Sequence, residues 1–364
     1  MTQIKQWLLL EPLDTLFCKG SEPMIAGESH EVRSVFPPMP STILGALITA
    51  ILYQRQIRPQ DFTRDSGPSP EIVENYRLLG SPGQPEFEVA GPIFRITNMD
   101  GEQDWFLPVP AHWFGPVPAT SLEGYGKPVE QMKVTTGDIL PDNLKAMGLL
   151  GSVSNPVWVL DPSEPDLRSL SGCWANAAAF DATAHGAGEV GFHASVKTVN
   201  PRQPAMIGPR QLFGNELRVG IALKANTRRV LPGHLYSAVQ VRLCDGAAMA
   251  VGLSETLTPS HLDAEGILRL GGEQRVVRYH TLDQEPDYRP GKGPWVMALS
   301  PLPYNDLERH GWTDAARASA GLIRMGGWDM KKGFHKPMCA YVPAGTVIRH
   351  VAEADIPFGF IRVN

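Results

Sequence analysis

The residues whose types and spacing best suit chemistry lie close together in the segment Gly321–Ala344. A pair of glycines is followed there by a tryptophan and a cluster of basic side chains. These residues are Gly326, Gly327, Trp328, Lys331, Lys332, His335 and Lys336. Glycine lets a backbone pass close to a ligand, cations neutralise phosphates, and Trp328 or Phe334 can stack on a base. The segment therefore predicts a site for a polyanion.

This segment is basic, whereas the chain as a whole is acidic. From Arg317 to Arg349 there are six lysines and arginines and one acidic residue, Asp329, whereas the whole chain has a net charge of −5. A cationic loop on an acidic protein is better explained by a specific polyanion than by general electrostatic attraction. The alternative is a solvated basic loop, which has no use for an exposed tryptophan.

A second candidate site is the loop that leads into the first predicted helix, residues His30–Leu47. A helix N-terminus offers unpaired N–H groups and a partial positive charge, so it can hold a phosphate. The polar residues spaced to assist it are His30, Arg33, Ser34, Ser41 and Thr42. The alternative is a rigid proline-rich loop with an ordinary helix cap. His30 could also be a general base for RNA cleavage, although a single histidine without a partner is more often structural.

Other chemistries find less support. His185, Glu189 and His193 would share one face of a helix and resemble a metal site, but the glycines between them indicate a loop instead. Two-metal nucleases need clustered carboxylates, and the pair Asp161 and Asp166 forms no such cluster. The sequence contains no GxSxG serine elbow, and the glycine-rich segment Gly321–Ala344 contains neither the GxGxxG motif nor the Walker motif. We therefore expect no catalytic set, no metal site and no cofactor, which favours a binding role.

The sequence of the N-terminal third predicts a strand and a helix beside the second candidate site. Ile4–Leu10 ends in an apolar run typical of a buried strand. A helix follows from Pro40–Thr42, with Ser41 or Thr42 as its N-cap. Its apolar face comprises Leu44, Leu47, Ile48, Ile51 and Leu52. Gly45 in this helix costs about 1 kcal/mol relative to alanine, so we expect it to pack closely against a strand.

Further along, Ser69–Gly80 predicts a second helix, and Ile93–Thr97 with Trp105–Val109 predicts a hairpin. The predicted order of elements is strand, helix, helix, strand and strand. This order is compatible with a ferredoxin-like βαββαβ unit that carries insertions. Pro110–Pro209 has poor periodicity and predicts insertions, loops and one or two helices. The remaining chain is mostly β. Its strands are expected at Arg218–Leu223, Leu235–Leu243, Ala247–Leu253, Arg275–Tyr279, Trp295–Leu299, Cys339–Val342 and Thr346–Val351, with the second and third forming a hairpin.

Length and composition describe a globular protein. The 364 residues favour two domains, 1–210 and 211–364, with a boundary uncertain by about twenty residues. The four cysteines are far apart and form no CxxC motif, which fits a reducing cytoplasm. The N-terminus has no signal-peptide layout, and no stretch approaches the roughly 20 apolar residues of a membrane helix. We therefore expect no membrane partner.

Two blocks carry a resemblance to a known family. Leu8–Leu47, with its "PLD.LF" and "H..RS.FPP.PST..GAL" pieces, resembles the start of the RAMP subunit of type III-B CRISPR (Cmr) effector complexes that holds the 5′ tag of the guide RNA. Gly326–Val347, with "GGWD", "KP" and "VPAG", is similar to the glycine-rich stretch of the same family. Arg218–Leu223 and Gly233–Leu243 resemble its central strands. The resemblance does not clearly cover Pro110–Pro209.

The resemblance implies an α+β protein of two ferredoxin-like (RRM-like) domains with long loop insertions. It implies a non-catalytic subunit of a ribonucleoprotein that grips the crRNA 5′ tag. Its protein partners would be the large polymerase/cyclase-type subunit and the RAMP backbone subunits. Position by position, five residues match the N-terminal motif, namely His30, Arg33, Ser34, Ser41 and Thr42. Another five match the C-terminal motif, namely Gly326, Gly327, Lys331, Lys332 and Lys336. We expect the two motifs to form one cationic pocket.

Two other functions stay open on the sequence. RAMP relatives that process crRNA are metal-independent endoribonucleases, and in such an enzyme His30 would be the acid/base. The chain could also be an assembly scaffold that makes no contact with RNA.

Overall fold

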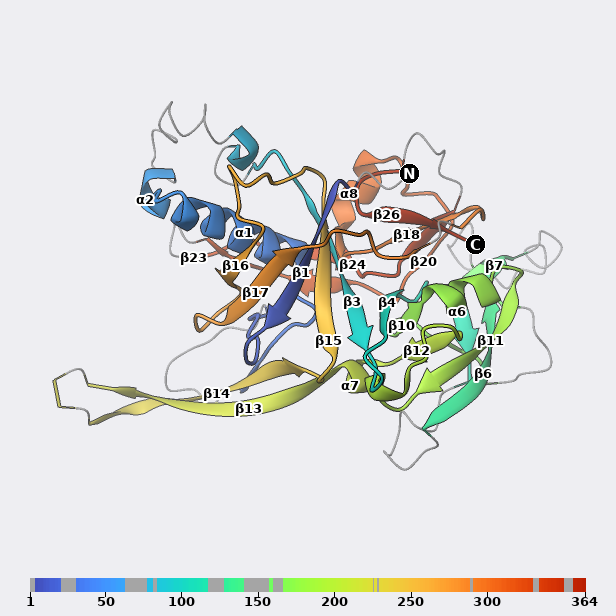
Figure 1. Ribbon diagram of the computed structural model, residues 1–364, viewed down its shortest axis with the longest axis horizontal. Coiled ribbons are helices and arrows are strands. Elements are labelled where there is room, and N and C mark those ends of the chain that lie inside the picture. The colour runs from blue at the N-terminus through green and yellow to red at the C-terminus, as the bar shows by residue number, and fades with distance from the viewer. Residues whose placement is uncertain are drawn as a thin grey trace.

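The computed structural model describes residues 4–20, 31–62, 77–80, 84–116, 128–140, 157–159, 166–224, 226–227, 229–288, 291–329, 334–349 and 356–364. The protein is mostly β-sheet with few helices, so the expected α+β class is confirmed (Figure 1). In the described part of the chain, no helix is both long and apolar enough to cross a lipid bilayer.

The largest element is a sheet of twelve strands. Their order across the sheet is β16 (Glu265–Arg269), β17 (Val276–Thr281), β1 (Gln6–Pro12), β15 (Ala247–Leu253), β3 (Val89–Thr97), β4 (Gln103–Pro108), β10 (Trp174–Asn176), β12 (Ala205–Ile207), β11 (Ala187–His193), β6 (Val129–Thr136), β5 (Trp113–Gly115) and β9 (Arg168–Ser169). β1 is antiparallel to both of its neighbours, β15 and β17. The sheet thus joins strands from both sides of residue 210. The division of the chain at that residue stays a prediction.

The predicted buried strand is confirmed in β1, because Leu8, Leu9 and Leu10 are 0% exposed. Successive side chains of a strand point to opposite faces. Leu8 and Leu10 therefore enter one core cluster, and Leu9 enters another on the other face of the sheet.

The first helix, α1 (Pro40–Gln54), packs on the face that carries Leu8 and Leu10. It begins at Pro40 with Met39 as the N-cap, so the expectation of Ser41 or Thr42 as the cap was wrong. Proline suits the first position because its missing N–H has no helical partner there. The close packing expected at Gly45 was also wrong, because this residue is exposed and a Cβ there would meet nothing within 4 Å.

Short helices surround these strands: α2 (Pro59–Phe62), η1 (Arg77–Leu79), α6 (Ala177–Ala182), η2 (Val196–Thr198) and α7 (Pro209–Leu212). Most of the predicted helix Ser69–Gly80 lies outside the described residues. The predicted hairpin is confirmed, since β3 and β4 are antiparallel and joined by a turn. In that turn the Asn98 Oδ1 accepts hydrogen bonds from the N–H groups of Asp100 and Glu102 at 3.0 and 2.9 Å.

Two expectations about strands were wrong. Ala247–Leu253 does not pair with the preceding strand, because six of the seven residues of β15 are buried and it inserts between β1 and β3. The described part of the region 110–209 contains strands that were not expected, since β5, β6, β10, β11 and β12 extend the large sheet. Its two short strands β7 (Asp138–Ile139) and β8 (Val157–Trp158) form a separate pair.

The C-terminal third adds smaller sheets. One has the order β20 (Arg317–Ala318), β25 (Val347–Arg349), β18 (Trp295–Ala298) and β26 (Phe360–Val363), and the helix α8 (Tyr304–Arg309) contributes Leu307 to its core. A second sheet has the order β19 (Leu302–Pro303), β24 (Cys339–Val342) and β21 (Ile323–Met325). The short strands β22 (Trp328–Asp329) and β23 (Phe334–His335) form a third.

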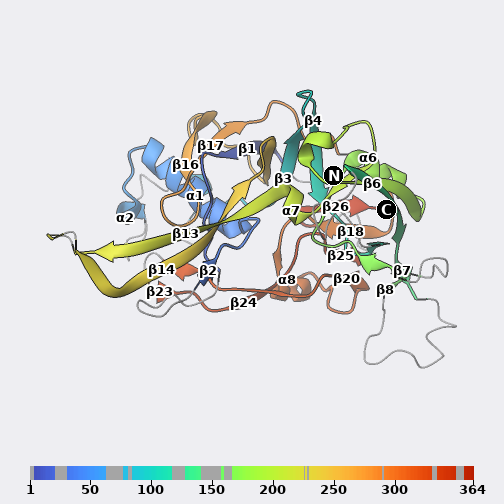
Figure 2. The same cartoon turned by 90° about the horizontal axis from the view of Figure 1, so that it is seen from below.

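One long hairpin projects from the body of the molecule. It consists of β13 (Phe213–Leu223) and β14 (Val230–Leu243), and the short strand β2 (Glu31–Arg33) runs parallel to β14 near its root. Both views show the hairpin extending along the longest axis, well beyond the strands of the large sheet (Figures 1 and 2).

Candidate functional site

One face of the projecting hairpin carries a row of exposed apolar side chains. Alternate residues of a strand share a face, which places the following β13 residues together. They are Leu217, Val219, Ile221 and Leu223, and with Val230 of β14 they are between 48% and 63% exposed. Apolar side chains gathered in this way on a projecting element are typical of an interaction surface.

β2 adds charged residues to the same face. Residues paired across neighbouring strands share a face, and Arg33 is paired with Val239, which is itself paired with Leu217. The Arg33 Nε donates a hydrogen bond to the Glu31 Oε1 at 2.9 Å, and the Arg33 side chain is 74% exposed. We call this surface, formed by Glu31, Arg33 and the exposed apolar row, the hairpin face.

The other polar residues of the N-terminal motif have different surroundings. The Ser34 Oγ accepts a hydrogen bond from the Cys18 N–H at 2.8 Å, and the Ser34 N–H donates to the Val239 carbonyl oxygen at 2.9 Å. Ser34 therefore fastens the segment after β2 to its neighbours. Ser41 is exposed and Thr42 half-buried in the first turn of α1. His30 lies outside the described residues.

The C-terminal motif surrounds a small hairpin. Trp328 of β22 pairs with His335 of β23, and the Lys336 N–H donates to the Gly327 carbonyl oxygen at 2.8 Å. Phe334 is 68% exposed, so its ring is accessible to a partner. Lys331 and Lys332 lie outside the described residues, as do the side chains of Trp328 and His335.

The fold itself does not require glycine at the two glycine positions of this motif. Neither Gly326 nor Gly327 has a φ in the left-handed region. A Cβ at Gly326 would come no closer than 3.6 Å to another atom, and one at Gly327 would lie 3.3 Å from the flexible Lys336 side chain. Close approach of another molecule would explain glycine at these positions.

Both views place β23 toward the same end of the long axis as α1 and the hairpin (Figures 1 and 2). That the two motifs form one pocket stays a prediction, because Lys331 and Lys332 are outside the described residues. A cavity of about 350 Å³ lies elsewhere, at the hairpin root. Glu11, Asp14 and Asp245 line it together with Arg95 and Arg242, so its charge does not favour an anion.

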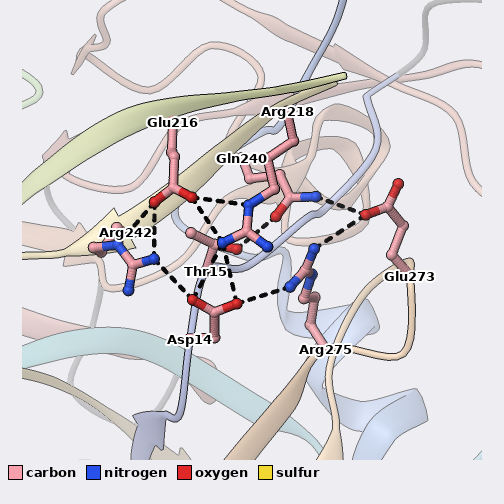
Figure 3. A network of polar contacts seen from close by, with 8 residues as sticks. All are labelled: Asp14, Thr15, Glu216, Arg218, Gln240, Arg242, Glu273 and Arg275. Carbon is pink, nitrogen blue, oxygen red and sulfur yellow. Dashed lines mark hydrogen bonds and ion pairs between the residues drawn. The ribbon is translucent and has the colours of Figure 1, made fainter. Parts of the chain in front are cut away.

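Sequence reasoning missed a network of ion pairs at the hairpin root (Figure 3). Its centre is Asp14, whose carboxylate accepts hydrogen bonds from Arg218, Arg242 and Arg275. The available signal was the alternation of polar residues along each hairpin strand, which places Glu216 and Arg218 on the face opposite the apolar row.

The segment that carries His185, Glu189 and His193 is not the expected loop, because Glu189 and His193 belong to β11, whereas His185 lies in the turn before it. His185 and Glu189 are exposed, whereas His193 is buried with its Nδ1 3.1 Å from the Thr198 Oγ1. Burial lowers the pKa of His193. Within the described ranges, no three His, Cys, Asp or Glu side chains gather in a group that could hold a metal ion.

Comparisons with known proteins give one strong match. The model of the family described as CRISPR-associated protein (Cas_Cmr3) matches residues 8–355. No curated protein matches the chain. A solved structure of the type III-B Cmr-beta complex bound to cognate target RNA and AMPPnP contains a similar chain, with 15% identity, 94% of this chain and 86% of that chain covered, and a TM-score of 0.49. The Csm3–Csm4 subcomplex of the type III-A interference complex contains another, with 10% identity, coverage of 98% and 94%, and a TM-score of 0.40.

Proposed function

Because this chain belongs to the CRISPR-associated protein (Cas_Cmr3) family, and so is a subunit of a type III-B effector, we propose that it holds the 5′ tag of the crRNA. In the same proposal it links the large polymerase/cyclase-type subunit to the RAMP backbone subunits. It would do so in the cytoplasm and without cleaving RNA.

The observation that carries the proposal is the hairpin face, on which Arg33 stands in line with exposed apolar side chains. Single-stranded RNA is bound by cations that neutralise phosphates and by apolar or aromatic groups that cover bases. Arg33 supplies the cation, and its match to the family motif makes it a residue to test. Phe334 and Lys336 on the β22–β23 hairpin would supply a ring and a second cation, since both are exposed.

The shape of the molecule supports the bridging part of the proposal. The β13–β14 hairpin extends beyond the body (Figure 1), so it can reach a neighbouring subunit. Leu217 and Val219 are 59% and 63% exposed on it. Burial of this apolar surface against a partner would stabilise the assembled complex.

Strand order supports two ferredoxin-like units, which are part of the proposal. α1 lies between β1 and β3 in the chain, and these two strands flank β15 in the sheet. Likewise α8 lies between β18 and β20, which flank β25. Two parallel strands joined through a helix, with a third strand between them, form the split β-α-β arrangement of ferredoxin-like folds. The first of these units draws its strands from both sides of residue 210.

The first prediction concerns Arg33. We expect Arg33→Ala to weaken binding of an RNA that carries the 5′ tag, and to lower the slope of log K against log [salt] by about 0.7 for a lost contact to one single-strand phosphate. Titration of labelled RNA into the full complex at several salt concentrations measures both quantities. Arg309→Ala is the matched control, because Arg309 is 78% exposed and also paired with a nearby carboxylate.

The same titration with Lys331→Ala combined with Lys332→Ala tests the C-terminal motif. Unchanged affinity and salt slope in both the Arg33 variant and this double variant would contradict the proposed tag site. If labelled crRNA gives no crosslink to this subunit at its 5′ end, the subunit is a scaffold.

A separate experiment tests the absence of catalysis. Repeat RNA incubated with the purified protein in EDTA should stay intact. Cleavage that disappears in His30→Ala would establish the endoribonuclease alternative.

A further inference from the structure

We infer that Asp14 sets the direction in which the β13–β14 hairpin projects from the body of the protein. Three arginines, two from the hairpin and one from the body, converge on its carboxylate (Figure 3). Two of them, Arg218 and Arg242, belong to the hairpin, and the third, Arg275, directly precedes β17 of the large sheet. The inference deepens the proposed function, because it concerns the element that we propose to dock on neighbouring subunits.

The contacts of Asp14 divide between the hairpin and the body. On the hairpin side, the Arg242 Nη2 lies 2.8 Å from the Asp14 Oδ1, and the Arg218 Nη2 lies 3.3 and 3.2 Å from Oδ1 and Oδ2. On the body side, the Arg275 Nη1 lies 3.0 Å from Oδ2. Each carboxylate oxygen is therefore shared by cations, and charge-assisted bonds of this kind fix geometry as well as adding energy.

Glu216 makes a similar pair of bonds but cannot fix the direction. It accepts from the Arg218 Nε at 2.8 Å and from the Arg242 Nε at 2.9 Å. All three residues belong to the hairpin, so these bonds move with it. The bonds to Asp14 are the described ion pairs of Arg218 and Arg242 that cross from the hairpin to the body.

Neighbouring contacts hold the same line across the root, and β2 pairs with residues 237–239 of β14 just beyond it, but no described strand of the body pairs with the outer part of the hairpin. Leu16 and Val241 exchange two backbone hydrogen bonds, of 2.7 and 2.9 Å. The buried Gln240 donates to the Glu273 Oε2 at 2.6 Å and accepts from the Thr15 hydroxyl. Among the described residues, Val219–Leu223 pair within the hairpin and with no strand of the body. A small rotation about this line would therefore move the outer part of the hairpin a long way.

The carboxylate is charged under all ordinary conditions. Partial burial acts to raise the pKa of Asp14, but the hydrogen bond from Arg242 and the charges of Arg218 and Arg242 hold it below its usual value of 3.8. Single ion pairs on a surface contribute little. Here several cations share one carboxylate, and Arg275 is only 16% exposed with no partner for its Nε among the described residues. Loss of the Asp14 charge would remove one of the two described carboxylates that pair with this guanidinium and leave Glu273, at 3.2 Å, as the other.

The test measures the direction of the hairpin in the full chain. Spin labels are placed on Leu223→Cys in the hairpin and Arg309→Cys on the body, with the exposed Cys339 replaced by serine. Asp14→Asn keeps the shape of the side chain and removes its charge. We expect the distance distribution between the labels to broaden at least twofold in this variant. Glu216→Gln is the matched control, and we expect it to leave the distribution unchanged.

An unchanged distribution in Asp14→Asn, or equal broadening in Glu216→Gln, would overturn the inference. Because 1 M salt screens partly exposed charges, it should broaden the distribution of the protein with Asp14 intact, which tests the idea without relying on a variant. Circular dichroism confirms that Asp14→Asn is folded. If Asp14→Asn broadens the distribution but the complex still assembles, the role of Asp14 in fixing the hairpin is supported. The proposed docking of the hairpin on neighbouring subunits is then contradicted, so the two hypotheses can fail separately.

Discussion

His112 is buried in the core, and its burial makes the stability of the folded chain depend on pH. It is 0% exposed, and its ring stacks on Trp295 with centroids 5.1 Å apart. Its Nε2 donates to the Asn364 carbonyl oxygen at 3.2 Å, while its Nδ1 has no hydrogen-bond partner among the described residues. Burial lowers the pKa of His112 to about 4, although the hydrogen bond to the backbone of Asn364 and the charge of Asp138 act to raise it.

This pKa predicts a loss of stability in mild acid. Below its usual pKa of 6.5 the unfolded histidine binds a proton, whereas the folded one stays neutral until about pH 4. The unfolded state therefore binds more protons in this window, and stability falls as pH falls. As the pH falls from 7 to 5, we expect the free energy of unfolding to decrease by about 2 kcal/mol because of His112. Urea denaturation at the two pH values measures it.

His112→Phe is the control, because phenylalanine retains an aromatic ring beside Trp295 and does not titrate. The free energy of unfolding of the protein with His112, minus that of the variant, should fall by about 2 kcal/mol from pH 7 to pH 5. Burial raises the pKa of Asp104 to about 6, which acts in the opposite direction but equally in both proteins. A difference that is the same at both pH values would contradict the assignment to His112.

Among the elements, we expect the β13–β14 hairpin to contribute to assembly of the complex and little to the stability of the fold. Its apolar row is exposed, so the folded chain gains little from it, and apolar residues at four alternate positions of β13 are typical of a contact with another molecule. Its opposite face carries the ion pairs of the root. The two faces of one strand can thus serve separate purposes, because successive side chains of a β-strand point to opposite faces.

The hairpin face predicts a variant that folds but does not assemble. We expect Leu217→Ser combined with Val219→Ser to change the free energy of unfolding by less than about 0.5 kcal/mol, as is usual at exposed positions. Incorporation into the effector complex should fall at least tenfold, because the exposed row would no longer bury apolar surface against a partner. Size-exclusion chromatography of the reconstituted complex measures incorporation. Ile267→Ser, at a position that is 61% exposed on β16, is the matched control. Normal incorporation of the double variant would argue against docking through this face.

At the scale of the molecule, the two ends of the chain depend on each other. β1 lies between β15 and β17, with Leu8 paired to Val251 on one side and to Thr281 on the other. A fragment that ends at residue 210 lacks both neighbours. The apolar run of β1, completely buried in the full chain, would then be exposed along both strand edges.

We therefore expect residues 1–210 expressed alone to fail to fold. Co-expression with residues 211–364 should restore a folded complex, because the missing neighbours of β1 are then present. Circular dichroism and size-exclusion chromatography distinguish the two results. A fragment 1–210 that unfolds cooperatively on its own would instead support the domain division near residue 210.

Features that depend on neighbouring residues in the chain could be predicted without the structure. The apolar run of β1, part of the buried face of α1 and the asparagine turn between β3 and β4 follow from periodicity and turn chemistry, which are local. The motifs at the two ends were enough to indicate the family. Even locally there were errors: Gly45 faces solvent and Met39 caps α1, because neither packing nor the exact cap position is written in the spacing of apolar residues.

Which distant segments meet became visible in the three-dimensional fold and not in the sequence. β15 pairs with β1 and β3 and not with the strand before it, and β2 runs parallel to β14. The arginines that converge on Asp14 come from 204, 228 and 261 residues further along the chain. Pairing across such separations is selected by the fit of whole faces and by complementary charge, which no local pattern records.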